Sequence, residues 1–298
     1  MPEHDIPDGF DYVGDVYRPP GEAHNILIQA TIGCSHGGCT FCSSHLGKRF
    51  DIKSQDVLER DLRFAERYCT RQDRVFVMDS NALCMPMERW LWLLENIRIR
   101  LPWVRGVGAF ATGMDIAAKS DADLQRLREL DLDLIYLGVE SGDDKVLEQV
   151  CKGIDAEGLR VQGRRAKQAG MALNISVLIG IVDARISLAH AQATGRLLSD
   201  INPEHITILT LIPQKGTVLH GQLERGEIVP PDRLGLLREL KEMLIHTELD
   251  GGLFDYSHST TLLPFRARLL EDKDRALAHI DEAIQGNVIL RQEAERHI

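Results

Sequence analysis

Apolar and polar positions along the chain form blocks that predict strands separated by helices. Six short apolar runs have the length of strands, and the stretches between them repeat apolar residues at helical spacing. The predicted strands are residues 25–31, 74–78, 106–112, 134–139, 173–179 and 205–211. Strands that alternate with helices favour parallel βαβ units with right-handed crossovers. We therefore expect an α/β fold in which six parallel strands form an open, partial (β/α)6 barrel.

The same pattern predicts how the chain is divided. Residues 1–23 are rich in proline and glycine, which predicts an irregular N-terminal arm. Residues 24–249 contain all six predicted strands and form the partial barrel. Residues 250–298 follow the Gly251-Gly252 break and end in an apolar-faced helix, so we expect a helical and loop extension that covers the barrel mouth.

Several chemically active residues lie where predicted strands end. Parallel strands bring their carboxyl ends to the same edge of a sheet, and functional loops gather there. Asp79, Glu140 and Gly180 each lie at or just after such an end, and a cysteine-rich loop follows the first strand. This shared position predicts that they form one site.

The cysteine-rich loop runs from Gly33 to Cys42 and contains three of the six cysteines. Thiolates bind soft metals and iron–sulfur clusters, and the Gly37-Gly38 pair lets the backbone turn tightly enough to direct three sulfurs to one point. Three ligands leave one position of a tetrahedral or cubane site open. A structural zinc site closes that position, whereas a chemical site keeps it for a substrate or cofactor.

Three interpretations of the loop compete. A zinc knuckle could recruit His36 or His45 as a fourth ligand. Disulfides are disfavoured, because a chain of 298 residues can bury a sizeable core without covalent links. The third interpretation is an iron–sulfur cluster held by three thiolates. Cys69 and Cys151 lie outside the loop and are spare on the cluster interpretation, and the helical spacing around Cys69 indicates a buried apolar position.

The loop and the strands and helices after it resemble the radical S-adenosylmethionine (SAM) superfamily. In that family a cysteine loop after the first strand of a partial barrel holds a [4Fe–4S] cluster whose open iron binds SAM. The resemblance implies that Cys34, Cys39 and Cys42 are the cluster ligands, and Phe41 before the last cysteine also fits. The commonest family spacing has three residues between the first two cysteines, whereas this chain has four. Variant spacings occur within the superfamily.

The resemblance also implies residues that contact SAM. The family turn after the second strand, often Gly-Gly-Glu, meets the amino group of SAM through backbone carbonyls, and Asp79-Ser80-Asn81 stands there in this chain. Glu140 and Ser141 match the polar strand-four end that reads the ribose. Lys152 matches a basic residue that meets the carboxylate of SAM, and Gly180 and Ile181 match the strand-five end along the adenine. Each assignment has an alternative. Asp79-Ser80-Asn81 could be a turn that caps the next helix, Lys152 a solvated lysine at a helix end, and the strand-five end ordinary core.

Two further places are candidates for substrate contacts. Cys84 lies three residues after Asn81, in the loop that follows the second predicted strand, so we expect it to face the substrate cavity. It could donate a hydrogen atom there, or it could only pack within the loop. His258, Arg266 and Arg268 belong to a polar segment after the Gly251-Gly252 break. They suit a carboxylate or phosphate on the substrate, unless the segment is only a solvated loop.

The implied activity is that of a radical SAM enzyme. Its reduced cluster cleaves SAM, and the resulting 5′-deoxyadenosyl radical abstracts hydrogen from a small organic substrate. An oxygen-sensitive cluster and an electron donor such as flavodoxin or ferredoxin follow from the resemblance. The rival hypothesis from another class is a zinc- or Fe–S-binding module without enzymatic activity, which senses redox state or scaffolds a complex.

Charge and hydropathy limit the partners and the compartment. The net charge of −10 with dispersed basic residues disfavours nucleic acid. No apolar run is long enough to span a membrane, and the acidic first residues are unlike a signal peptide, so we expect a cytoplasmic protein that keeps its thiols reduced. The oligomeric state and the identity of the substrate do not follow from the sequence.

Overall fold

A computed structural model describes residues 9–296, with the side chain of Glu293 left out. Residues 1–8 of the expected N-terminal arm lie outside this range. The strands are β1 (Ile26–Gln29), β2 (Thr31–Ile32), β3 (Asp51–Ile52), β4 (Arg74–Met78), β5 (Gly106–Ala111), β6 (Leu132–Glu140), β7 (Ala172–Ile179), β8 (His205–Thr210), β9 (Leu253–Tyr256) and β10 (Phe265–Arg268).

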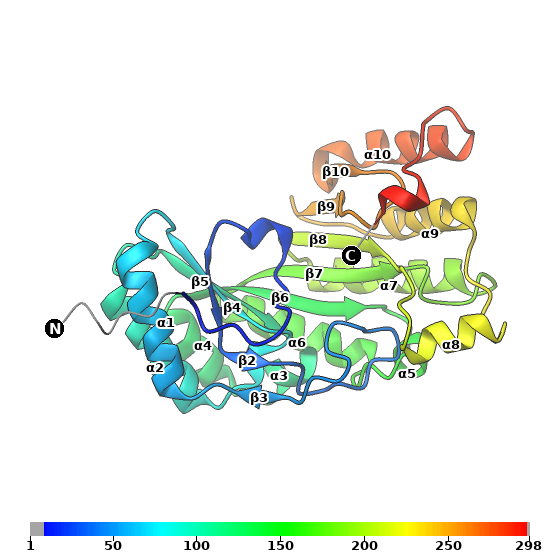
Figure 1. The fold of residues 1–298 in the computed structure, drawn as a ribbon. Coiled ribbons are helices and arrows are strands. Elements are labelled where there is room, and N and C mark those ends of the chain that lie inside the picture. The colour runs from blue at the N-terminus through cyan, green and yellow to red at the C-terminus, as the bar shows by residue number, and fades with distance from the viewer. Residues whose placement is uncertain (1–8, 297–298) are drawn as a thin grey trace. The chain divides into compact units, whose positions relative to one another are not determined.

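Helices occupy most of the segments between the strands (Figure 1). They are α1 (Gln55–Tyr68), α2 (Met87–Arg100), α3 (Gly113–Ala117), α4 (Asp121–Glu129), α5 (Asp144–Gln149), α6 (Ala156–Gln168), α7 (Ser187–Ile201), α8 (Val218–Glu224), α9 (Arg233–Ile245) and α10 (Leu269–Ile284). Short 3-10 turns are η2 (Pro20–Glu22), η3 (Ala82–Cys84) and η4 (Glu293–Glu295).

The larger sheet has eight strands in the order β1-β4-β5-β6-β7-β8-β9-β10, and β2 pairs with β3 separately. Most of the eight strands are parallel, and the sheet is open, as expected for a partial (β/α) barrel. The structure adds β9 and β10 to the six expected strands. Phe254, Asp255 and Tyr256 are all buried, so this part of the polar C-terminal region is a covered strand of the sheet.

The chain divides into two compact units. The first comprises Gly47–Tyr136, Arg165–Ala172 and the described residues up to Gly37. The second comprises Gly38–Leu46, Leu137–Arg164 and the described residues from Leu173 onward. The unit boundary therefore falls within the cysteine-rich loop and again within β6, so each unit is described by itself.

The first unit is built on β1, β4 and β5, which pair in parallel. Its core contains the fully buried Val75, Phe76 and Val77 of β4, flanked by α1 and α2. Trp90 of α2 is also fully buried, and its indole N–H donates to Ala82 O at 3.2 Å. That bond fixes the turn after β4, which is where one of the predicted site segments begins.

The second unit is built on β7, β8 and β9, which pair in parallel, while β10 returns antiparallel to β9. Helix α9 packs against both α7 and α10. Gly195 of α7 makes close packing with α9 feasible, because a Cβ there would lie 2.6 Å from Met243 O. Helices α7 and α9 thus form a closely packed pair.

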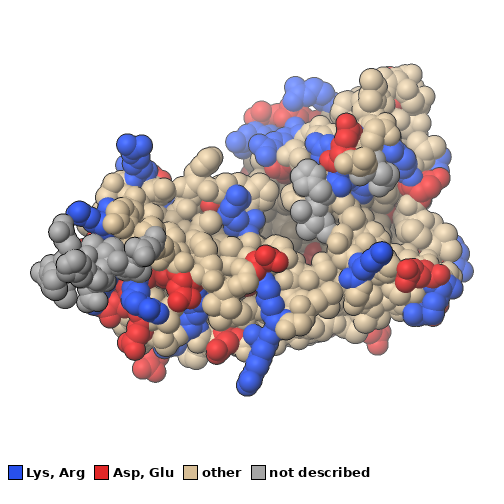
Figure 2. All heavy atoms as spheres, in the orientation of Figure 1, with Lys and Arg blue, Asp and Glu red and all other residues tan. Residues whose placement is uncertain are grey.

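Surface charges of both signs are interspersed on the described part of the face in Figure 2, where Lys and Arg lie among Asp and Glu. A search of the described residues finds no helix with the length and hydropathy of a membrane span.

Candidate functional site

Cys34 belongs to the first unit, where the loop leaves β2. Gly33 has a φ of 76° and Gly37 a φ of 58°, so both occupy the left-handed region that glycine tolerates. The N–H of Gly33 donates to Asp79 Oδ2 at 3.3 Å, and the N–H of Ser35 donates to Asn81 Oδ1 at 3.1 Å. The turn after β4 therefore holds the backbone on both sides of Cys34.

Cys39 and Cys42 belong to the second unit. Between them, the N–H of Thr40 donates to Val150 O at 3.1 Å, and Thr40 O accepts from the N–H of Leu219 at 3.0 Å. Phe41 packs against an apolar cluster that includes Val150 and Ile181. The aromatic residue that fits the family motif thus anchors this half of the loop on α5, α8 and the end of β7.

All six cysteines are thiols, and Cys34, Cys39 and Cys42 are each partly exposed. Within residues 9–296, no three His, Cys, Asp or Glu side chains lie close enough together to hold a metal ion. The grouping of the three thiols around one cluster stays a prediction from their spacing in the chain. Their chemistry fits the group, because three accessible thiols within nine residues are the donor set that an iron–sulfur cluster requires.

Cys84 ends η3, in the loop after β4, as its distance from Asn81 along the chain predicted. The thiol is partly buried, and burial, with a smaller contribution from Asp115, raises its pKa to about 11. Cys84 is therefore a neutral thiol at ordinary pH. Lys119 is buried close by, with its ammonium donating to Met85 O at 3.0 Å, and burial lowers the pKa of this lysine.

Glu140 ends β6 with a φ of 65°, a conformation that costs energy for any residue other than glycine. Its Oε1 lies 3.0 Å from Lys152 Nζ, and both side chains are buried. Gly138 leaves the space for this contact, because a Cβ there would lie 2.7 Å from Glu140 Oε1. The acidic and basic residues predicted to read SAM are thus a buried ion pair of the second unit.

Ser141, which was expected at the ribose together with Glu140, is fully buried. Its hydroxyl lies 2.9 Å from His190 Nδ1 and accepts from the N–H of Asp143 at 2.9 Å. His190 Nε2 lies 3.1 Å from Leu178 O, so Nε2 carries the proton and Nδ1 accepts from Ser141. The Ser141 side chain therefore ties the end of β6 to α7, and the ribose contact of Glu140 and Ser141 stays a prediction.

Gly180 follows β7 with a φ of 75°, and its N–H donates to Glu239 Oε1 at 3.0 Å. Glu239 and His190 are both fully inaccessible to solvent, 3.5 Å apart. Burial raises the pKa of Glu239 to about 8 and lowers that of His190 to about 4. Burial thus opposes charge on both groups, so the contact is one between neutral side chains rather than an ion pair.

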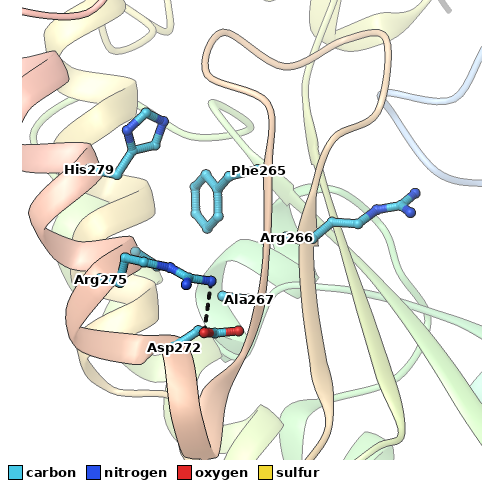
Figure 3. Close-up of a pocket in the computed structure, with 7 residues that line it drawn as sticks. Phe265, Arg266, Ala267, Asp272, Arg275 and His279 are labelled. Atoms are coloured by element: carbon cyan, nitrogen blue, oxygen red, sulfur yellow. Dashed lines mark ion pairs between the residues drawn. The ribbon is translucent and has the colours of Figure 1, made fainter.

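The polar C-terminal residues make separate contacts in the second unit. Arg266 pairs with Asp255 at 2.9 Å, whereas the N–H of Arg268 donates to Asp272 at 3.0 Å at the start of α10. His258 Nδ1 lies 3.1 Å from Thr260 Oγ1. A cavity of about 250 Å³ lies between β10 and α10, and Arg266 is among the residues that line it. In Figure 3 the Phe265 side chain points toward α10, whereas the Arg266 side chain points away from it.

A model of the radical SAM superfamily matches residues 28–189, more than half of the 298 residues. The chain belongs to the radical SAM superfamily. Members of this superfamily use a [4Fe–4S] cluster and SAM, so the family identification confirms the resemblance that the cysteine loop predicted. No curated protein sequence matches the chain.

Solved structures of radical SAM enzymes share the fold. Methylornithine synthase (PylB) superposes with a TM-score of 0.52 at 18% identity, over 76% of this chain and 63% of that one. Coproporphyrinogen III oxidase (HemN) from Escherichia coli superposes with a TM-score of 0.56 at 16% identity, over 74% of this chain and 50% of that one. The cobalamin-dependent S-adenosylmethionine radical enzyme OxsB, with SAM and aqua-cobalamin bound, superposes with a TM-score of 0.52 at 15% identity, over 91% of this chain and 37% of that one. The match thus spans less than two thirds of each of these proteins.

Three buried residues near the predicted site escaped the sequence analysis: Asp115, His190 and Glu239. Signals for two of them were present. Thr112-Gly-Met-Asp115 directly after β5 has the spacing of a capping box, which the structure contains. Glu239 shares a helical face with Leu236 and Met243, and a carboxylate among buried leucines indicates a special environment. His190 had no comparable signal in its segment.

The neutral Glu239 predicts a pH dependence of stability in this radical SAM protein. Between the ordinary pKa of 4.5 and the native value of about 8, the folded state keeps a proton that the unfolded chain releases, so stability falls as pH rises. His190 acts in the opposite direction between about 4 and its ordinary 6.5. Of these two groups, only Glu239 still changes stability with pH above 6.5.

We therefore expect Glu239→Gln to remove a loss of stability above pH 6.5 that reaches at most about 1.4 kcal/mol per pH unit. Urea denaturation of the wild type and the variant at pH 6.5 and pH 8 measures the difference. Glu271→Gln, a change at an exposed carboxylate of α10, is the control and should behave as the wild type does. Parallel pH profiles for wild type and Glu239→Gln would show that Glu239 is charged throughout this range.

Proposed function

We propose that this protein is a radical SAM enzyme in which Cys34, Cys39 and Cys42 hold a [4Fe–4S] cluster. The observation that carries the proposal is the position of these three thiols in one loop inside the segment that matches the superfamily. The strands and helices that follow belong to the same match, which extends to residue 189. A zinc-binding or scaffolding module is not favoured, because such a module would account for the loop alone.

When bound, the cluster supplies the electron that cleaves SAM, and SAM supplies the radical that takes hydrogen from the substrate. The work of the chain is to hold the ligands, orient SAM and exclude water. In each unit the cysteine loop is anchored by backbone hydrogen bonds, at Gly33 and Ser35 in the first and at Thr40 in the second. Fixed backbone on either side of the thiols reduces the loss of conformational entropy on cluster binding.

For SAM itself we assign the backbone carbonyls of Asp79, Ser80 and Asn81 to the amino group. Glu140 is assigned to the ribose diol, where an ionised carboxylate is a strong acceptor. Lys152 balances the charge of Glu140 at 3.0 Å and is the cation assigned to the SAM carboxylate. Gly180 and Ile181 are assigned to the adenine, Gly180 through its close backbone and Ile181 through the apolar cluster that it shares with Phe41.

The substrate proposed here is a small organic molecule. Cys84 is a neutral thiol, because its pKa of about 11 keeps the S–H bond intact, and an intact S–H is what hydrogen-atom donation requires. His258, Arg266 and Arg268 keep their proposed role toward an anionic group of the substrate. A flavodoxin or ferredoxin is the proposed electron donor, and the cytoplasm is the proposed compartment.

Loss of any one loop thiolate should abolish the cluster, because one iron then lacks its protein ligand. We expect Cys34→Ala, Cys39→Ala and Cys42→Ala to retain almost no iron and sulfide after anaerobic reconstitution, and to lose the broad absorption of the cluster. Cys69→Ala and Cys151→Ala are the matched controls and should reconstitute as the wild type does. Full iron content in Cys39→Ala, or one colourless zinc per wild-type chain, would contradict the proposal.

The assignment of Glu140 is tested by SAM affinity. Glu140→Gln keeps the shape of the side chain and removes a charge-assisted hydrogen bond of about 1.5–3 kcal/mol, so the Kd for SAM should rise roughly tenfold to hundredfold. Calorimetry on the reconstituted protein measures the Kd, and thermal unfolding of the same samples verifies that the fold survives the loss of the pair with Lys152.

The control for this change is Glu148→Gln, at an exposed carboxylate of the neighbouring helix α5. It should leave the Kd unchanged. A folded Glu140→Gln protein with a Kd within twofold of the wild-type value would remove Glu140 from the SAM site.

A further inference from the structure

The turn after β4 holds Cys34 through side chains, which is a different task from the backbone contact with SAM proposed above. Asp79 Oδ2 accepts the N–H of Gly33 at 3.3 Å, just before Cys34. Asn81 Oδ1 accepts the N–H of Ser35 at 3.1 Å, just after it. Both side chains are fully buried. The bond to Gly33 is buried as well, and the bond to Ser35 is partly buried.

The carboxamide of Asn81 makes three hydrogen bonds within the first unit. Besides accepting from Ser35 N–H, its Nδ2 donates to Ser35 Oγ at 2.6 Å and to Asp115 Oδ1 at 3.2 Å. This pattern determines the orientation of the amide group. A flipped amide would direct its N–H groups at the Ser35 N–H and its oxygen at the Asp115 carboxylate.

Asp115 is in turn held rigidly at the start of α3. Its Oδ2 accepts from Thr112 N at 2.7 Å and from Thr112 Oγ1 at 2.8 Å, which completes a capping box. The other oxygen, Oδ1, is the one that meets Asn81. A continuous chain of hydrogen bonds therefore runs from the first turn of α3 through Asp115 and Asn81 to Ser35.

On these contacts we propose that Asp79, Asn81 and Asp115 form a clamp that positions the thiol of Cys34 for the cluster. The proposal rests on the proposed function, since it needs Cys34 to be a ligand. The three are positioning residues, and none of them binds iron. Here the side chains of the Asp-Ser-Asn turn serve the cluster ligand, while the backbone carbonyls of that turn stay available for SAM.

The clamp has a physical consequence for the chain without its cluster. Ser35 is exposed, so its N–H would exchange readily with solvent if Asn81 did not accept its hydrogen bond. Residues that orient a metal ligand typically change metal affinity by about 10–100-fold when they are removed. Amide protection can thus be measured on the apoprotein, and cluster retention on the loaded protein.

The first test is site-resolved hydrogen exchange of the Ser35 amide in the full-length apoprotein. Asn81→Ala removes all three bonds of the carboxamide, so exchange at Ser35 should be at least about tenfold faster than in the wild type. Asn81→Asp keeps an acceptor for Ser35 but places a second carboxylate against Asp115, and its rate should lie between the two. Asn81→Asp also serves as the test variant if Asn81→Ala does not fold.

The matched control is Asn174→Ala, a change at another buried asparagine, whose Oδ1 accepts from Thr207 Oγ1 in the second unit. Exchange at Ser35 should be unchanged in this protein. Exchange at Ser35 that is equally slow in the wild type and in the folded Asn81 variant would overturn the clamp.

The second test measures how fast a strong iron chelator removes the cluster from the reconstituted protein. We expect removal to be about tenfold faster or more for Asn81→Ala than for wild type and Asn174→Ala. Equal rates in all three proteins would overturn the positioning role even if the amide result held. A wild-type protein that takes up no iron would instead contradict the proposed function, and the exchange data would still report whether the clamp exists.

Discussion

Parallel pairing of β1 with β4, and of β4 with β5, is the constraint on which the environment of Cys34 depends. Because the carboxyl ends of parallel strands lie at one edge of the sheet, the loops that follow these strands are brought together. Asp79 and Asn81 come from the loop after β4, and Asp115 comes from the turn after β5. Their hydrogen bonds to Gly33 and Ser35 are the direct result of that pairing. A helical or antiparallel arrangement would separate these residues.

In the second unit, buried neutral side chains hold the chain at the ends of β6 and β7. Ser141 and Gly180 are held by His190 and Glu239, which come from α7 and α9. Neutral partners suit this position, because an isolated charge in a fully buried layer costs several kcal/mol. Glu140 and Lys152, by contrast, are both buried and form an ion pair, with 3.0 Å between Glu140 Oε1 and Lys152 Nζ. Both arrangements fix strand ends without leaving an unbalanced charge.

The sequence was sufficient for the fold class, because six strands with helical spacing between them allow few other arrangements. It also predicted that Asp79, Glu140 and Gly180 lie at or just after strand ends, which the bounds of β4, β6 and β7 confirm. What it missed were contacts made by side chains from distant segments. The bond between Asn81 and Asp115 joins residues 34 apart, and that between Gly180 and Glu239 joins residues 59 apart. Periodicity and spacing say nothing about such pairs.

The pairing of Arg266 with Asp255 illustrates the same limit. Polar composition after Gly252 suggested a loop over the site, whereas the two ends of this segment are the strands β9 and β10 and only the residues between them, including His258, form a loop. Composition alone cannot separate a solvated loop from a strand that has one polar face. The cluster loop, by contrast, has support from both its donor set and the family match.

The central claim is that three thiolates hold a [4Fe–4S] cluster with one iron open to SAM. Electron paramagnetic resonance of the reduced, reconstituted protein with and without SAM tests it most directly. A spectrum typical of a reduced [4Fe–4S] cluster, which changes shape when SAM is added, is the predicted result, since SAM must alter the ligands of one iron. A cluster spectrum that SAM leaves unchanged, or the absence of any cluster signal, would contradict the account.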